Sequence, residues 1–141
     1  MKKLTNYLYY VSMIAIALWI AYTKGWILAN FEMMKSTQAI SIIKQDTNIT
    51  LLDVRTKEEY KSGHIANSIN IPLDKLKRNL QRLPKNKKVL VYCRSGNRSI
   101  SASRILKQYG YTPIDIKGGI ISLVSNGMKV EMWNLFGATI T

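Results

Sequence analysis

The chain holds a single cysteine, Cys93, in a short loop of small and polar residues. The apolar run 89–92 predicts a buried strand before the loop, and a helix is predicted to begin after it. Backbone N–H groups and the positive end of the helix dipole would then converge on the sulfur, which favours the nucleophilic thiolate. Arg94 and Arg98 add positive charge suited to an anionic substrate. The loop therefore predicts nucleophilic cysteine chemistry, in preference to an inert buried thiol.

Predicted helices and strands alternate from residue 36 onward. Strands or extended segments are expected at 49–54, 65–72, 89–92 and 112–116. Helices are expected after an N-cap at Ser36, over 57–61 behind a Thr56–Glu59 capping box, over 73–83, over 97–109 and over 120–127. The spacing indicates an α/β fold, with a mainly parallel sheet covered by helices on both faces.

Ligands of such folds sit beyond the carboxyl ends of the strands, where Cys93 is expected. Asp53 and Arg55 follow the strand 49–54 and belong to the same edge. They are expected either to touch substrate or to form an ion pair that braces the cysteine loop. We favour the ion pair, because charges near buried sites are usually paired.

The N-terminus is apolar and separate from this pattern. Residues 4–22 follow two lysines and come close to the ~20 residues that cross a bilayer as a helix. Aromatic residues gather at both ends of this stretch, as in interfacial belts: Tyr7, Tyr9, Tyr10, Trp19, Tyr22 and Trp26. The sequence therefore predicts a transmembrane anchor over 1–30, a domain over 31–130 and an apolar tail over 131–141 that contains Trp133, Leu135 and Phe136.

A cleaved signal peptide is the alternative for this segment. Its best cleavage site, 27–29, has a bulky residue where a small one is wanted, so we favour the anchor. Lys2 and Lys3 lie on one side of the apolar stretch, and Lys24 lies on the other. The positive-inside rule then leans toward a catalytic domain on the extracytoplasmic, periplasmic side.

The formal net charge is +13, and the stretch 75–88 is rich in lysine and arginine without any acid. A solvated basic face is expected, with an anionic lipid surface as the alternative. No nucleic-acid motif accompanies the charge, so nucleic acid is not an expected partner. One cysteine excludes an internal disulfide. Neither a metal nor a cofactor is expected.

Four segments of the chain match one family in order and at its spacing: 52–60 (LDVRTKEEY), 63–72 (GHIANSINIP), 92–99 (YCRSGNRS) and 117–120 (KGGI). Residues 33–130 thereby resemble the rhodanese-type sulfurtransferases. The resemblance implies a single rhodanese domain whose cysteine carries a persulfide. The sulfur would come from a small anionic donor, thiosulfate or a persulfide. It would pass to a thiol, to cyanide or to a protein acceptor.

The resemblance assigns the catalytic role to Cys93. Substrate binding then falls to the remaining residues of the loop: Arg94, Ser95, Gly96, Asn97, Arg98 and Ser99. Their N–H groups would hold the charge of the terminal sulfur, as an oxyanion hole does for oxygen. The single histidine, His64, falls in a turn of the family pattern and is expected to be structural.

Two rival functions remain. A phosphatase or arsenate reductase also uses a cysteine loop at a helix N-terminus, but with arginine six residues after the cysteine, where this chain has Ser99. A loop one residue shorter should crowd a tetrahedral phosphate. The other rival is a membrane-tethered persulfide carrier or interaction module, which transfers sulfur only to a docked partner.

Overall fold

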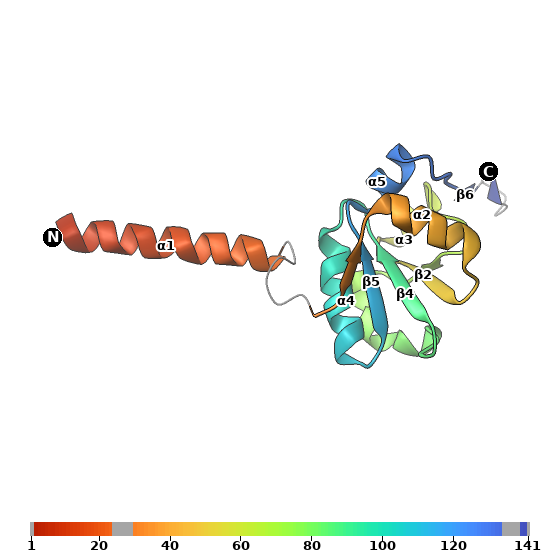
Figure 1. Cartoon of the computed structure of the whole chain (residues 1–141), viewed down its shortest axis with the longest axis horizontal. Coiled ribbons are helices and arrows are strands. Elements are labelled where there is room, and N and C mark those ends of the chain that lie inside the picture. Colours follow the sequence, from red (N-terminus) through yellow and green to blue (C-terminus); the bar gives the residue numbers. More distant parts are fainter. Residues whose placement is uncertain (1, 24–29, 134–138, 141) are drawn as a thin grey trace.

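The computed structural model describes residues 2–23, 30–133 and 139–140. Helix α1 (Lys2–Thr23) projects from an α/β domain that begins at strand β1 (Glu32–Met34) (Figure 1). The stretch Leu4–Thr23 has a mean hydropathy of 1.5, is long enough to cross a membrane, and is not buried against the rest of the described chain. Lys24, Trp26 and the candidate cleavage site 27–29 lie outside the described residues.

The domain is built on a five-stranded parallel sheet in the order β1-β5-β4-β2-β3. Its other strands are β2 (Ile49–Asp53), β3 (Ile69–Asn70), β4 (Lys88–Tyr92) and β5 (Thr112–Ile116). The strands β4 and β5 are buried on both faces apart from their first residues. This burial explains the continuous apolar sequence 89–92 of β4, whereas β5 includes the buried Asp115. The predicted α/β fold is confirmed.

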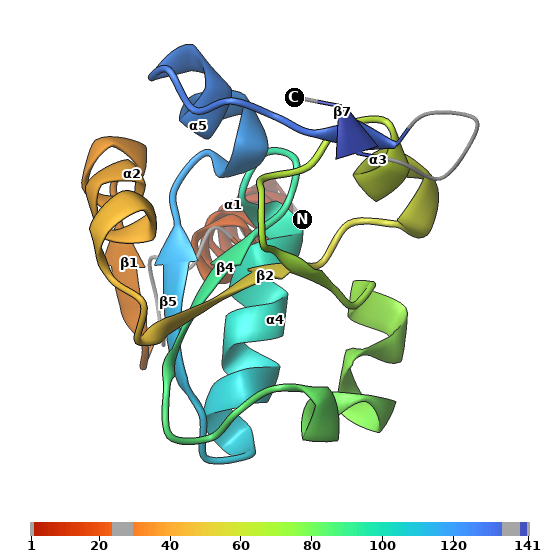
Figure 2. The same ribbon diagram turned by 90° about the vertical axis from the view of Figure 1, so that its right-hand side faces the viewer.

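Helices cover both faces of the sheet (Figure 2). One face packs on α2 (Ser36–Gln45) and α5 (Gly119–Ser125), through side chains such as Leu90 and Tyr92. The other packs on α4 (Asn97–Gln108) and on two 3₁₀ helices, η1 (Leu73–Arg78) and η2 (Leu80–Arg82). Side chains alternate along β4, so Val89, Val91 and Cys93 belong to the core on the α4 side.

The prediction of a single helix over 73–83 is wrong. Two 3₁₀ helices occupy this segment, and they are interrupted at Asn79. Residues three apart eclipse one another in a 3₁₀ helix, so the pairs Leu73–Leu76 and Leu80–Leu83 still face the core. The hydroxyl of Tyr111 donates to the carbonyl of Leu80 at 2.6 Å and ties this segment to the start of β5.

Other boundaries also differ from the expectations. Ser36 is the first residue of α2 and not its cap, and its hydroxyl bonds the Ser122 hydroxyl of α5 at 2.8 Å. Tyr109, expected on the buried face of its helix, is 49% exposed. The edge strand β1 and the short strands β6 (Met132–Trp133) and β7 (Thr139–Ile140) were not predicted. Leu135 and Phe136 lie outside the described residues.

A pair of glycines brings α5 against the chain that follows β4. Gly118 and Gly119 have φ values of +78° and +58°, which favour glycine. The N–H of Ile120 donates to the carbonyl of Cys93 at 2.8 Å, and that of Ile121 to the carbonyl of Arg94 at 3.3 Å. A Cβ at position 119 would lie 2.4 Å from the Cys93 oxygen, so only glycine permits this approach.

We expect Gly119→Ala to lower the free energy of unfolding far more than Gly110→Ala. Both positions have positive φ, which costs an alanine about 1–2 kcal/mol. Position 110 has nothing within 4 Å of an added Cβ, whereas position 119 also meets backbone atoms of Cys93 and Arg94. Urea denaturation followed by circular dichroism measures the difference. Equal losses in the two variants would show that the contact with the loop is not what requires glycine.

Candidate active site

Cys93 directly follows β4, is separated from the start of α4 by residues 94–96, and is 1% exposed. The N–H of Gly96 donates to Cys93 Sγ at 3.1 Å. Ser99 Oγ lies 3.6 Å from the same sulfur and donates to the Gly96 carbonyl at 3.1 Å. The helix dipole and a backbone donor therefore meet at the sulfur, and the predicted strand–loop–helix arrangement is present.

The loop needs glycine at one position. Gly96 has φ +103° and precedes α4 as its cap residue. This left-handed conformation turns the chain back so that the Gly96 N–H points at the sulfur. Ser95 and Asn97 are exposed, and Ser99 is buried. Two clefts border the loop: one of about 700 Å³ beside Asn97, and one of about 230 Å³ beside Ser95 and Gly96.

The two loop arginines have different surroundings. Arg98 forms a bidentate ion pair with Glu59 of α3 (Lys57–Lys61), with N–O distances of 2.7 and 2.8 Å. Arg94 is exposed and forms no ion pair within the described ranges. Arg94 is therefore the loop arginine whose charge is available to an anion.

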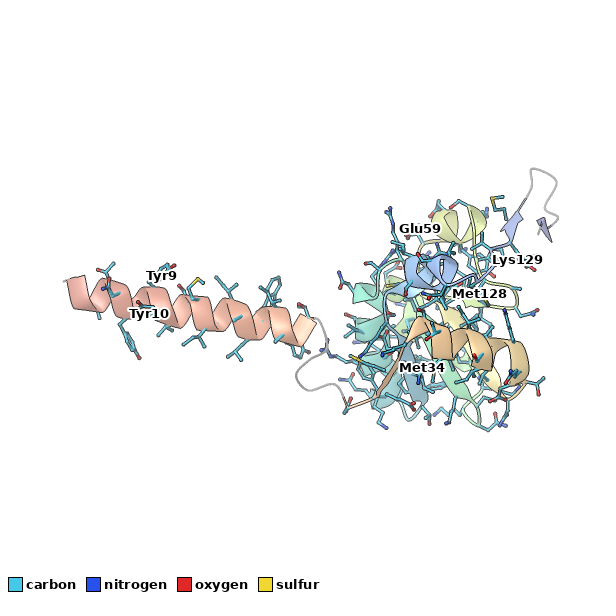
Figure 3. The ribbon with its side chains drawn as sticks, turned by 45° about the horizontal axis from the view of Figure 1, so that its top comes forward. Tyr9, Tyr10, Met34, Glu59, Met128 and Lys129 are labelled. Atoms are coloured by element: carbon cyan, nitrogen blue, oxygen red, sulfur yellow. The ribbon has the colours of Figure 1, made fainter. Side chains whose placement is uncertain are left out.

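Glu59 takes part both in the capping box of α3 and in the ion pair with Arg98 of the cysteine loop. It completes the predicted capping box, in which its carboxylate accepts the Thr56 N–H at 3.0 Å while the Thr56 hydroxyl accepts the Glu59 N–H at 3.2 Å. Hydrogen bonds from Arg98 lower the pKa of Glu59 to about 2, against the opposing effect of burial. Figure 3 labels Glu59 near the edge of the domain. The sequence held no signal for the Arg98 contact beyond opposite charge.

Asp53 and Arg55 form a buried ion pair at the end of β2, with Arg55 Nη2 2.7 Å from Asp53 Oδ2. The same Nη2 also donates to the Gly63 carbonyl at 2.7 Å. Burial acts to lower the pKa of Arg55, but the hydrogen bonds and charge of Asp53 outweigh it and raise the pKa. Asp53 and Arg55 thus form the ion pair that we favoured from the sequence. Its further hydrogen bond goes to Gly63 and not to the cysteine loop, so the bracing of that loop stays a prediction.

One acidic residue at this edge was missed. Asp115 lies at the end of β5, is 1% exposed and borders the smaller cleft beside the loop. Burial raises its pKa to about 6, although Ser99 and Lys117 act to lower it. Its Oδ1 has no hydrogen-bond partner among the described residues. An acidic residue near the carboxyl end of a predicted strand was the available signal.

His64 lies in a separate structural cluster. Its Nδ1 is 2.9 Å from the carbonyl oxygen of Tyr60, its ring stacks on Tyr60 at 3.8 Å, and its Nε2 is 4.0 Å from Glu131. Backbone hydrogen bonds also join His64 to Glu131, at the start of the tail. These contacts agree with the expected structural role. Within the described residues, no group of three or more His, Cys, Asp or Glu could hold a metal ion.

Known proteins share this fold. The profile of the rhodanese-like domain family matches residues 36–125, and the chain belongs to that family. A sulfurtransferase of Allochromatium vinosum is 33% identical over 84 residues, 59% of this chain and 78% of the relative. The thiosulfate sulfurtransferase PspE of Escherichia coli is 39% identical over 80 residues, 55% of this chain and 77% of the relative.

The solved structures agree with this assignment. The crystal structure of a rhodanese-related protein from Thermoplasma volcanium superposes with a TM-score of 0.66 at 38% identity. The match covers 71% of this chain and 97% of that one. The resemblance to rhodanese-type sulfurtransferases is therefore confirmed at the level of family and fold.

We expect the contribution of Glu59 to the free energy of unfolding to decrease as the pH falls. Its pKa is depressed from 4.5 to about 2, so its contribution is present above the ordinary value and is lost as the pH falls toward 2. Glu59→Gln keeps a side chain that can cap α3 but loses the charge facing Arg98. The difference in unfolding free energy between wild type and Glu59→Gln should therefore be constant near neutrality and vanish in acid.

Urea denaturation at a series of pH values measures this difference. Glu58→Gln is the matched control, because Glu58 is the adjacent, exposed acid and makes no ion pair with Arg98. A difference for Glu59→Gln that stays the same down to pH 2 would contradict the role of the ion pair.

Proposed function

We propose that the chain is a sulfurtransferase in which Cys93 carries a sulfane sulfur as a persulfide. The observation that supports this most directly is the Gly96 N–H donated to Cys93 Sγ at 3.1 Å, at the opening of α4. A donor in this position favours negative charge on sulfur, first on the thiolate and then on the persulfide. The family relationship supplies the reaction class, since sulfurtransferases are among the relatives.

In the first half-reaction, the Cys93 thiolate attacks the outer sulfur of an anionic donor such as thiosulfate. A new S–S bond forms to Cys93, the S–S bond of thiosulfate breaks, and sulfite leaves with the electron pair. Arg94 is the exposed loop arginine that has no ion pair among the described residues, and it would attract the donor and the departing sulfite. A persulfide donor reacts in the same way and leaves a thiolate.

In the second half-reaction, a thiolate or cyanide attacks the outer sulfur of the persulfide. The sulfur leaves with the acceptor, and Cys93 departs as a thiolate, so the cycle closes without an external oxidant or reductant. The first helical turn of α4 directs N–H groups that have no intrahelical acceptor toward this region. The residues 94–99 would thus bind the transferred sulfur, while Asp53 and Arg55 hold the neighbouring edge of the sheet.

We also propose that α1 anchors the domain in a membrane as a single span. The support is its apolar stretch Leu4–Thr23, whose large side chains are exposed. The division is then an anchor over 1–30, a rhodanese domain over 31–130 and a tail over 131–141. The two N-terminal lysines favour the extracytoplasmic side for the domain.

Cys93→Ser should abolish both thiosulfate:cyanide sulfurtransfer and the single-sulfur adduct detected by intact-protein mass spectrometry. A second variant, Cys93→Ser with Ser125→Cys, restores a thiol at an exposed position outside the loop and should remain inactive. Activity near wild type in either variant would refute the mechanism. Uptake of sulfur by Cys93 without transfer to cyanide or any small thiol would identify a persulfide carrier that needs a protein acceptor.

The full-length chain should stay in the membrane fraction after both carbonate and high-salt washing. Salt screens exposed charges within ~10 Å at 0.1 M but does not extract a spanning helix. The fragment 31–141 should be soluble and should retain sulfurtransferase activity. A mature protein that begins at Asn30 and is free in solution would establish a cleaved signal peptide in place of the anchor.

A further inference from the structure

The end of α1 that leads to the domain lies against α4. The guanidinium of Arg104 on α4 stacks over the Tyr22 ring at 4.0 Å and donates a hydrogen bond to the Tyr22 carbonyl. Beyond this contact, α1 runs away from the domain (Figure 1). If α1 spans a membrane, this contact places the α4 face of the domain next to that membrane.

The aromatic residues of α1 indicate how close this face would lie to the lipid headgroups. Trp19 and Tyr22 lie near the domain end of the apolar stretch, where aromatic side chains of spanning helices sit among the lipid headgroups. Because Arg104 touches Tyr22, the Arg104 guanidinium lies at the same level. It is thus positioned at the depth of the lipid phosphates.

A cleft of about 700 Å³ lies between α1 and the domain. Trp19, Tyr22 and Ile105 supply apolar lining, and Lys77 and Arg104 supply cations. No acidic side chain of the described residues lines it. Arg98 also borders the cleft, but its charge is paired with Glu59. The lining suits a molecule with an anionic head and an apolar body.

Two further observations favour an anionic occupant. Arg104 Nε is buried and has no hydrogen-bond partner in the described part of the chain. The basic stretch 75–88, which includes Lys77, extends the positive charge from the second half of η1 through η2 and contains no acid, although Asp74 lies in the first turn of η1. A phosphate would pair with the Arg104 guanidinium through charge-assisted hydrogen bonds.

We infer that this cleft binds the headgroup of an anionic phospholipid, which fastens the domain to the bilayer surface beside its own anchor. The inference rests on the proposed anchoring role of α1. Asn97 and Arg98 of the cysteine loop line the same cleft, so a bound lipid holds this loop close to the bilayer. Sulfur acceptors would then be met at the membrane surface.

Native mass spectrometry of the full-length chain in mild detergent tests this inference. Phosphatidylglycerol, phosphatidylcholine or inorganic phosphate is added at equal concentration. We expect retained phosphatidylglycerol adducts in clear excess over phosphatidylcholine adducts. Lys77→Gln with Arg104→Gln should weaken phosphatidylglycerol binding roughly thirtyfold, because each basic residue near an anionic lipid contributes to binding.

The matched control is Lys44→Gln with Lys129→Gln. It removes the same charge at exposed positions on α2 and after α5, and Lys129 lies at the end of the domain away from α1 (Figure 3). This variant should bind phosphatidylglycerol as the wild type does. Lys77→Gln alone, at an exposed position, should show a smaller loss and keeps the test valid if the double variant does not fold.

Equal binding of the two lipids, equal losses in the control variant, or displacement of phosphatidylglycerol by inorganic phosphate would each overturn the inference. Membrane retention of each variant is measured on the membranes before they are solubilised, and sulfurtransfer is measured on the chain in detergent. A wild-type chain that stays in the membrane and transfers sulfur, but shows no preference for phosphatidylglycerol, loses only the headgroup site. A chain found free of the membrane refutes the anchor instead.

Discussion

The site depends on the contact between the start of α5 and the chain leaving β4. The N–H groups of Ile120 and Ile121 bind the carbonyls of Cys93 and Arg94, and Gly119 provides the space for this approach. With those carbonyls held, the chain turns through the left-handed Gly96 into α4, and the Gly96 N–H meets the sulfur. The reactive geometry therefore comes from a neighbouring crossover as well as from the loop's own residues. This explains why the glycine pair after β5 belongs to the site although it is distant from Cys93 in sequence.

Ion pairing determines which arginine side chains near Cys93 are left to interact with a substrate. Asp53 with Arg55 and Glu59 with Arg98 form two pairs around the carboxyl edge of the sheet. A partly exposed pair such as Glu59–Arg98 contributes about 0–1 kcal/mol to stability, so its larger consequence is positional. It links α3 to the first turn of α4 and neutralises the charge of Arg98, although the Arg98 side chain stays partly exposed. In the proposed reaction, the attraction of an anionic donor would then fall to Arg94 and to the N-terminus of α4.

Much of the fold was predictable because its signals are local. The strands around 49–54 and 89–92 are largely apolar runs between clear turns, and the strand 112–116 lies between glycine-marked turns. The Thr56–Glu59 capping box marks α3. The 3₁₀ segment 73–82 was misassigned because leucines three and four apart suit either helix type, and tertiary contacts such as Tyr111 to Leu80 act only in the folded chain. The Glu59–Arg98 ion pair and the burial of Asp115 were missed for the same reason. Both depend on the packing of elements that are distant from one another in the sequence. The placement of Cys93 was accessible because strand, loop and helix are contiguous.

The burial of the Cys93 sulfur and the proposed attachment to a membrane both limit which molecules can exchange sulfur with the site. Because Cys93 is only 1% exposed, a small anionic donor suits it better than a bulky one. Its persulfide would extend one atom further, toward the same N–H groups and toward the acceptor. If α1 anchors the domain as proposed, this single tether would confine encounters with acceptors to the bilayer surface. The local concentration of acceptors there would then matter more than diffusion through solution. Orientation then becomes limiting, because a freely rotating domain would present the loop to the membrane only part of the time. The Arg104–Tyr22 contact restricts that rotation from within the chain.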